Sequence, residues 1–196
     1  SDHTYIDVHR FHEWTVFDRS RGEFRTIETA DMEAQKLSSG TPGTRGHRYR
    51  FQLPFREAVD LPDANLPIDP YTLGVWLGDG TSTKAAITHH TDDEYDLPYE
   101  RTARCVHVDT GVVTDYYRDG LHAALKSLGV YGNKHIPVNY LRGSITQRRS
   151  LLSGLIDTDG CISGTQVSFD NANETLVRDT AELIRSLGYR AHVHRP

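Results

Sequence analysis

Two stretches of the chain place apolar residues at helical spacing and then end on an aspartate and a glycine. The longer one covers residues 144–160. Its apolar residues at this spacing are Leu151, Leu152, Leu155 and Ile156. Ser144 with Gln147 three residues later has the pattern of a capping box, and Gly160 is expected to stop the helix in the left-handed conformation. The pattern predicts a buried helix that ends on Asp159.

The earlier stretch, residues 69–80, ends in the same way. Asp69 is placed to cap the helix, and Pro70 suits its first position. Aligning Gly80 with Gly160 superimposes the small residues and the final aspartates of the two stretches. An aspartate followed by a glycine is common in turns, so a single helix with this ending says little. Its repetition is what makes the pattern informative.

Each stretch also places two small residues four positions apart. They are Gly74 and Gly78 in the first copy, and Gly154 and Thr158 in the second. This spacing puts both on one helix face, so two such helices can approach almost backbone to backbone. Their ends would then bring Asp79 and Asp159 together, and adjacent carboxylates repel unless a cation lies between them. Because hard oxygen ligands favour Mg²⁺ or Mn²⁺, the pattern predicts a metal site shared by the two helices.

The segments after the two predicted helices repeat the same order of elements. Each continues into candidate strands and a helix that stops at a glycine, Gly129 in the first copy and Gly188 in the second. The candidate strands are 84–90, 106–108, 112–114 and 166–169, and the candidate helices are 118–128 and 173–187. We therefore expect an α+β domain over 69–196. In it an αββα-type unit occurs twice, as repeat one over 69–131 and repeat two over 144–196.

Residues 1–53 have a different pattern, of short alternating strands. The candidate strands are 5–8, 14–17, 24–27 and 49–53, with a short helix capped by Thr29 that reaches residue 37, and a loop over 38–46. Residues 54–68 are rich in proline and aspartate and predict a linker. We expect a small all-β segment joined by this linker to the α+β domain.

The composition is that of an ordinary soluble protein. Only the distribution of charge along the chain adds to the predicted domain organisation. The chain has 196 residues, 37% hydrophobic and 25% charged, with two cysteines and no apolar run near the ~20 residues of a membrane span. These features predict a cytoplasmic protein without membrane contact. The net charge of −5 argues against nucleic-acid binding only as an average. Acidic residues cluster over 92–100 and basic ones over 142–149 and 185–195, so one face can be basic while another is acidic.

Leu152 to Gly160 closely matches the nine-residue signature of the LAGLIDADG homing endonucleases. The first copy departs from it, with Thr72 for the leading leucine, Trp76 for an aliphatic residue and Leu77 for the first aspartate. The last acidic position is kept in both copies. The chain thus resembles the single-chain, two-motif members of this family. The resemblance implies two pseudo-symmetric repeats in a monomer, double-stranded DNA as the partner, and a staggered double-strand cut with 3′ overhangs at a long asymmetric site.

The same resemblance implies roles in the chemistry. Asp79 and Asp159 would be the metal ligands, and the backbone carbonyls of Gly78 and Thr158 would add coordination. Lys134 lies in a block, GNKHIP, that resembles the intein block whose lysine reaches the active site, where an ammonium polarises water or offsets phosphate charge. The alternative is a surface lysine before a turn. Two residues are candidates for the corresponding basic group of the second half: Arg190 and His192.

The sheets of this family lie along the major groove of DNA, and the resemblance assigns polar strand residues to that contact. They are Thr83, Lys84 and Thr88 in the first repeat, and Ser163, Gln166 and Ser168 in the second. The alternative for each is an ordinary exposed strand residue. Arg148 and Arg149 precede the apolar part of the second motif helix. There they either approach backbone phosphates or cap a solvent-facing turn.

His12, followed by Glu13 and Trp14, resembles the histidine block of the intein splicing (Hint) fold. The family usually has threonine three residues before that histidine, where this chain has His9. The alternatives are a zinc half-site and two structural histidines. Neither a nucleophile-bearing first block nor a terminal His-Asn pair is present, so we expect residues 1–53 not to splice by themselves.

Together these patterns favour an intein-encoded, metal-dependent, site-specific DNA endonuclease, with most resemblance to the inteins of bacterial replicative helicases. One alternative is a catalytically inactive DNA-binding relic of the same fold, against which the intact Asp79, Asp159 and Lys134 argue. The other is part of a self-splicing intein in which protein splicing is the main activity. A metal-dependent cleavage assay decides the first alternative, and the full open reading frame decides the second.

Overall fold

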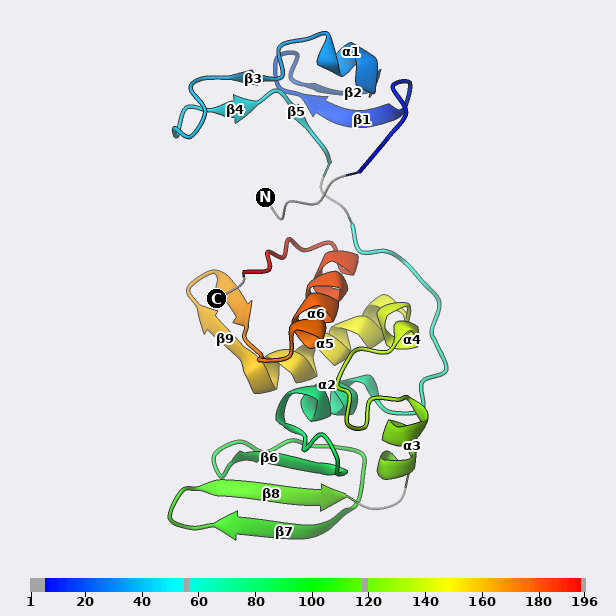
Figure 1. The fold of residues 1–196 in the computed structure, drawn as a ribbon, viewed down its shortest axis with the longest axis vertical. Helices are drawn as coiled ribbons and strands as arrows, with labels where there is room; N and C mark the ends of the chain where they lie inside the picture. Colours follow the sequence, from blue (N-terminus) through cyan, green and yellow to red (C-terminus); the bar gives the residue numbers. More distant parts are fainter. Residues whose placement is uncertain (1–5, 55–56, 118–119, 195–196) are drawn as a thin grey trace. The chain divides into compact units, whose positions relative to one another are not determined.

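A computed structural model describes residues 6–54, 57–117 and 120–194 of the chain (Figure 1). The protein divides into two compact units, residues 1–56 and 57–196. Short strands dominate the first unit, and all the described helices but one lie in the second. The protein therefore has the mixed α and β structure that the sequence predicts.

The first unit is built on a three-stranded antiparallel sheet in the order β2-β1-β5. Its elements are β1 (Glu13–Asp18), β2 (Glu23–Glu28), α1 (Thr29–Glu33), β3 (Ser38–Ser39), β4 (Arg48–Tyr49) and β5 (Phe51–Gln52). The β1–β2 hairpin buries Val16 and Ile27. Asp18, wholly buried, accepts hydrogen bonds from the Arg50 guanidinium at 2.8 and 2.9 Å. This ion pair ties the segment before β5 to the end of β1.

The strands predicted over 14–17 and 24–27 are confirmed, and each extends by one residue at either end. Residues 6–8 have no strand structure, and residue 5 lies outside the described residues. Ile6 is exposed, so the apolar alternation there has no buried face to stabilise it. The helix α1 ends at Glu33 instead of residue 37, because none of its side chains is buried. Part of the predicted loop instead forms β3, which pairs with β4.

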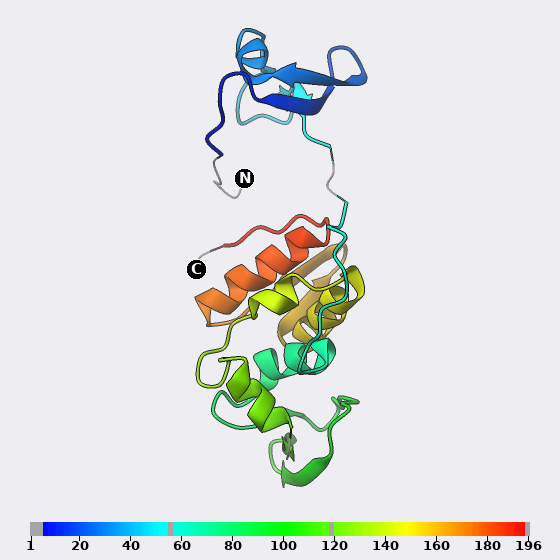
Figure 2. The ribbon, with the colours of Figure 1, turned by 90° about the vertical axis from the view of Figure 1, so that its right-hand side faces the viewer.

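Two helices, α2 (Pro70–Asp79) and α5 (Ile145–Asp159), lie side by side at the centre of the second unit (Figures 1 and 2). The other elements are β6 (Ala86–His90), β7 (Arg101–His107), β8 (Val112–Tyr117), α3 (Leu121–Ser127), α4 (Val138–Leu141), β9 (Gly160–Ser163), β10 (Gln166–Phe169) and α6 (Glu174–Ser186). The first three strands form an antiparallel sheet in the order β6-β8-β7 next to α2. The β9–β10 hairpin begins directly at the end of α5.

The first central helix is thus followed by three strands and a helix, and the second by two strands and a helix. The first segment therefore has one strand more than the predicted αββα unit, and its three strands overlap the candidates over 84–90, 106–108 and 112–114. All seven residues of β7 are exposed, so it has no hydrophobic period by which the sequence could reveal its full length. Of the helix predicted over 118–128, residues 121–127 form α3, and residues 118–119 lie outside the described residues.

Both central helices start as predicted. The Asp69 carboxylate accepts from the Thr72 amide at 2.9 Å, and the reciprocal capping box between Ser144 and Gln147 is present at 3.3 and 3.1 Å. Their ends differ from the prediction, since Gly160 is extended with φ of −91° rather than left-handed. Glycine is needed there for space, because a Cβ would lie 2.7 Å from the Ile156 Cα atom.

A single hydrophobic core surrounds the two central helices. Its members in those helices include Leu73, Trp76, Leu151 and Leu155, and those from the covering helices include Leu121, Leu125, Leu176 and Leu183. Residues 57–68, predicted as a linker, are attached to this unit by hydrogen bonds. The Val59 amide donates to the Ser186 carbonyl at 2.9 Å, and Ala64 exchanges two hydrogen bonds with the Gln147 side chain at 2.9 and 2.8 Å.

Candidate active site

The two central helices meet through their small residues, so their backbones are in direct contact. A Cβ on Gly74 would lie 3.0 Å from the Leu155 amide nitrogen, and a Cβ on Gly154 would lie 2.8 Å from the Val75 nitrogen. A Cβ on Gly78 would overlap the Thr158 side chain. All four small residues singled out in the sequence therefore lie in this seam between α2 and α5.

The seam brings the two terminal carboxylates close together. Asp79 is the last residue of α2 and Asp159 the last of α5, and both are partly buried. A Cβ on Gly78 would lie 3.3 Å from the Asp159 Oδ2 atom, so this carboxylate faces the last turn of α2. Burial raises the pKa of the Asp79 carboxyl, and the charge of Asp159 raises it further. The hydrogen bond from Tyr95 and the charge of Lys134 oppose this rise.

Each carboxylate is held by a neutral donor that the sequence did not identify. The Tyr95 hydroxyl donates to Asp79 Oδ2 at 2.9 Å, and the Asn171 side-chain amide donates to Asp159 Oδ2 at 2.6 Å. Burial raises the pKa of the Tyr95 hydroxyl, and the bond to Asp79 raises it further, so Tyr95 stays protonated as a donor. Tyr95 lies within a run of acidic residues that resembles a solvated surface, and Asn171 lies in a short loop before α6. Neither position carries a sequence signal of its own.

Lys134 also reaches the seam. Its Nζ atom donates to the Gly78 carbonyl at 2.9 Å and lies 5.3 Å from the centre of the Trp76 ring. Burial lowers the pKa of the Lys134 ammonium to about 8, although the charges of Asp159 and Asp79 act in the opposite direction. At neutral pH this amine is therefore close to the point where it can hold or release a proton.

The segment that carries Lys134 is fixed by helix α6 and the loop before it. The Asn173 side chain, which also caps α6, donates to the Lys134 carbonyl at 2.7 Å. The Ile136 amide donates to the Asp179 carboxylate at 2.9 Å. The block between the two sequence copies is thus held at the seam by the second copy.

The side chains at the seam fit a hard divalent cation. The Oδ1 atoms of Asp79 and Asp159 accept no hydrogen bond from any described residue, since the neutral donors both bind Oδ2. A cation between the carboxylates would also relieve the repulsion that raises the Asp79 pKa. The Gly78 carbonyl, predicted as a further ligand, accepts from Lys134. Over the ranges 6–54, 57–117 and 120–194, no group of three or more histidine, cysteine, aspartate or glutamate side chains forms a metal cluster, so the two aspartates stand alone.

The strand register places the predicted DNA contacts on shared faces. In the β9–β10 hairpin, Ser163 lies opposite Gln166 and Ser168 opposite Cys161, so all three predicted residues share one exposed face. In the larger sheet, the hydroxyls of Thr88 and Thr114 lie 3.1 Å apart on one face. Thr83 and Lys84 are exposed but lie in the turn before β6 and not in a strand as predicted, and the Lys84 Nζ lies 6.0 Å from the centre of the Tyr116 ring.

Arg148 is not a DNA contact, because it is wholly buried. Its guanidinium donates to the Gly143 carbonyl at 2.9 Å, to the Ser186 carbonyl and hydroxyl at 2.7 Å each, and to the Val59 carbonyl. Burial lowers the pKa of the guanidinium. Arg148 therefore joins three segments of the second unit, whereas its neighbour Arg149 is exposed.

This difference predicts opposite effects for two adjacent arginines. Arg148→Ala should lower the free energy of unfolding by more than about 3 kcal/mol, because it leaves several buried acceptors without a donor. Arg149→Ala should stay within about 0.5 kcal/mol of the parent, because surface substitutions seldom do more. Urea denaturation of the two variants measures the difference. Equal stabilities would contradict the role assigned to Arg148.

His9 and His12 belong to the first unit, and Arg190 and His192 belong to the second. His9 accepts from the Phe11 amide at 3.3 Å, and the His12 ring packs edge-on against Trp14 at 4.7 Å between centroids. Arg190 and His192 are exposed in the irregular segment after α6. In the described part of the chain, no helix is long and apolar enough to cross a membrane.

Comparison with known proteins agrees with this geometry. Residues 146–196, from the second central helix onward, match the family model described as a LAGLIDADG-like domain. This match confirms the resemblance to the LAGLIDADG homing endonucleases. A replicative DNA helicase DnaB of Mycobacterium intracellulare is 51% identical over 206 aligned residues, which cover 97% of this chain and 34% of the helicase. The chain spans about a third of the length of that relative, and its similarity to a segment of a replicative helicase agrees with the predicted resemblance.

Proposed function

We propose that this protein is an intein-encoded endonuclease that cuts both strands of DNA at a specific site with a divalent metal ion. The observation that carries the proposal is the meeting of Asp79 and Asp159 at the base of a glycine-packed seam, with Lys134 beside them. Two like charges and a buried amine at one point are costly to stability and typical of catalytic sites. A helix end with a purely structural role needs neither the two adjacent carboxylates nor the buried amine.

The two central helices and the sheets that follow them support a pseudo-twofold arrangement with one half for each DNA strand. Each half supplies one carboxylate and one neutral donor to it, Tyr95 for Asp79 and Asn171 for Asp159. Both halves lie in one chain, so a monomer is sufficient. The extra strand β7 and the single Lys134 make the halves unequal, which suits an asymmetric DNA site.

Asp79 and Asp159 would hold Mg²⁺ or Mn²⁺ through their free oxygens. A cation bound there supplies an activated water and stabilises charge on the phosphate. Tyr95 and Asn171 fix the orientation of the two carboxylates, so each presents its other oxygen to the seam. Lys134 offsets negative charge on the phosphate from the Trp76 side of the seam, where water is partly excluded.

The exposed sheet faces supply the proposed DNA contacts, despite the net charge of −5. Ser163, Gln166 and Ser168 on the hairpin can donate to or accept from base edges. In the larger sheet, Asp115 is buried on the face opposite Thr88 and accepts from Arg104 at 2.7 and 2.8 Å. The charge of Asp115 is therefore neutralised away from the proposed DNA surface.

The first unit is proposed to be part of an intein splicing domain. Its support is the mainly β framework and the position of His12 next to Trp14, whose indole nitrogen donates to the Thr29 hydroxyl at 2.9 Å. This assignment adds a second candidate function, protein splicing, which resides in a unit separate from the seam. It does not compete with cleavage for the same residues.

The experiment that tests the proposal uses a plasmid with the uninterrupted helicase coding sequence at the point where the relative carries the matching segment. We expect conversion to linear DNA in Mg²⁺ and no conversion in EDTA. A plasmid with the insertion in place is the control and should remain uncut. Tight binding of the uninterrupted site without cleavage would instead favour the inactive DNA-binding relic.

Replacing Tyr95 by Phe should raise the Mg²⁺ concentration needed for half-maximal cleavage by roughly ten-fold, as the loss of a hydrogen bond to a metal ligand typically does. The matched control is Tyr71→Phe, because the Tyr71 hydroxyl donates at 2.8 Å to Asp157 rather than to a seam carboxylate. Single-turnover rates across a Mg²⁺ titration measure both variants. Identical titration curves would show that Tyr95 does not position Asp79.

A further inference from the structure

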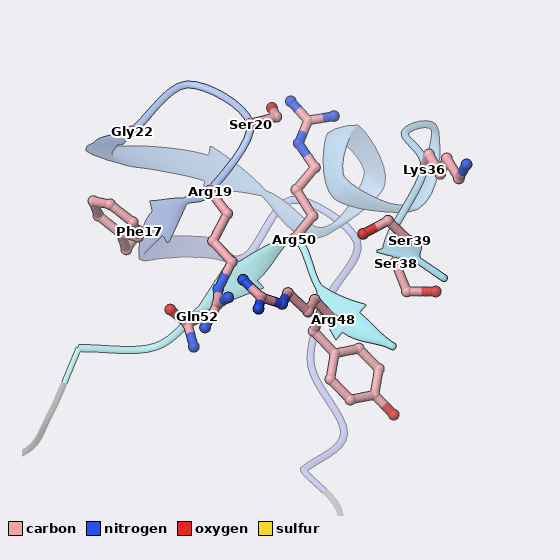
Figure 3. A pocket seen from close by; sticks show the side chains of 11 residues that line it. Phe17, Arg19, Ser20, Gly22, Lys36, Ser38, Ser39, Arg48, Arg50 and Gln52 are labelled. Carbon is pink, nitrogen blue, oxygen red and sulfur yellow. The ribbon is translucent and has the colours of Figure 1, made fainter. Parts of the chain in front are cut away.

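The first unit contains a basic pocket of about 700 Å³ that the endonuclease proposal does not use (Figure 3). It lies between the β1–β2 turn and the strands β3, β4 and β5. Its lining includes four cationic side chains and no aspartate or glutamate: Arg19, Lys36, Arg48 and Arg50. In a protein with a net charge of −5, such a lining is a local departure from the overall charge.

One of these cations is already neutralised. Arg50 forms two hydrogen bonds to the buried Asp18 carboxylate, and this ion pair holds the pKa of Asp18 far below its usual range. Arg25 and Arg21 also approach Asp18, at 3.5 and 4.0 Å. Several arginines thus share one carboxylate, and the neighbourhood remains positive.

Among the residues that the structure describes, no carboxylate lies within ion-pair distance of Arg19, Lys36 or Arg48. In Figure 3 the side chains of Arg19 and Arg48 point toward each other and toward Gln52, whereas Arg50 points the other way. An anion that binds between guanidinium groups accepts charge-assisted hydrogen bonds from them.

The pocket favours a phosphate on a large partner. Arg19, Lys36, Arg48 and Tyr49 are all exposed, so the site opens to solvent and does not enclose a small molecule. Guanidinium groups bind phosphate oxygens in a two-point geometry, and the serine hydroxyls of β3 add neutral donors. Contacts of this kind position a nucleic-acid backbone without reading its bases.

We propose that the first unit binds a DNA backbone phosphate between Arg19 and Arg48, with Lys36 adding positive charge at the rim. This inference rests on the proposed function, because the DNA is the duplex that the second unit cuts. The first unit then contributes affinity that does not depend on sequence.

The test compares two double variants of the full chain on a duplex with long flanks around the target site. Arg19→Ala with Arg48→Ala removes the proposed phosphate contacts. Arg10→Ala with Arg45→Ala is the matched control, because both arginines are exposed in the same unit, lie outside the pocket and change the net charge equally. Binding is measured in Ca²⁺ across a salt series, and thermal melting confirms that each variant is folded.

We expect the pocket variant to bind about ten-fold more weakly near 0.1 M salt, with a log K against log salt slope less steep by roughly 2. The control variant should keep the parent slope. Equal slopes in the two variants would overturn the inference. Cleavage and binding by the parent chain, measured on the same duplex, report separately on the proposed function. The inference alone fails if the parent cuts and the pocket variant binds like the parent.

Discussion

Replacing Asp79 or Asp159 by Asn is expected to reduce DNA cleavage more than about a thousand-fold while leaving affinity for the target within a few-fold. The loss exceeds the roughly hundred- to thousand-fold cost of removing one stabilising donor, because the carboxylates act as a pair on one cation. Binding persists because the proposed DNA contacts lie on the sheets and not at the seam. Single-turnover cleavage and direct binding assays on the same duplex measure the two quantities.

The double variant with Asn at both positions should be hardly worse than either single variant, since residues that act as a unit are strongly non-additive. The control is Asp157→Asn. Asp157 lies in α5, as Asp159 does, and its exposed carboxylate accepts a hydrogen bond from the Tyr71 hydroxyl. We expect this control to cut at nearly the parent rate. Efficient nicking of one strand by either single variant would show that the two carboxylates work at separate sites.

Replacing Gly154 by Leu is expected to lower the free energy of unfolding of the second unit by at least about 3 kcal/mol. Even the first side-chain atom would lie 2.8 Å from the Val75 nitrogen, and backbone atoms of a packed helix cannot move aside cheaply. A loss of this size should lower the melting temperature by about 10 °C. Circular dichroism during heating and in urea measures it.

Ser153→Ala is the matched control, because Ser153 is the adjacent residue of α5 and is exposed. Its stability should stay within about 0.5 kcal/mol of the parent. If the Gly154 variant has the same melting temperature as this control, the helices do not meet at the glycines. The proposed positioning of the carboxylates by the seam would then be wrong.

The parts of the fold that local chemistry decides could be predicted from the sequence. Helix starts follow from side chains within three residues of each other, such as Asp69 with Thr72 and Ser144 with Gln147. The seam follows from small residues at a fixed spacing, which are present twice. The location of Asp79 and Asp159 depends only on these two features.

The parts that depend on distant segments could not be predicted. Arg148 resembles a surface arginine in sequence, and only the approach of residues 57–68 and the end of α6 buries it. The donors Tyr95 and Asn171 become significant only where loops return to the helix ends. The sequence predicted that Gly160 ends the helix in the left-handed conformation, whereas in the structure it is extended. Glycine is required there because a Cβ would clash with Ile156, and no local sequence pattern indicates such a clash.

The most direct measurement of the central claim is the position of cleavage on each strand of a labelled duplex carrying the uninterrupted helicase site. We expect one cut on each strand, staggered with 3′ overhangs, in the presence of Mg²⁺. Both cuts should be absent in EDTA and absent in the Asp79→Asn, Asp159→Asn double variant. Two results would contradict cleavage by the paired carboxylates. One is a parent protein that binds this duplex tightly but leaves both strands intact, and the other is a double variant that cuts as the parent does.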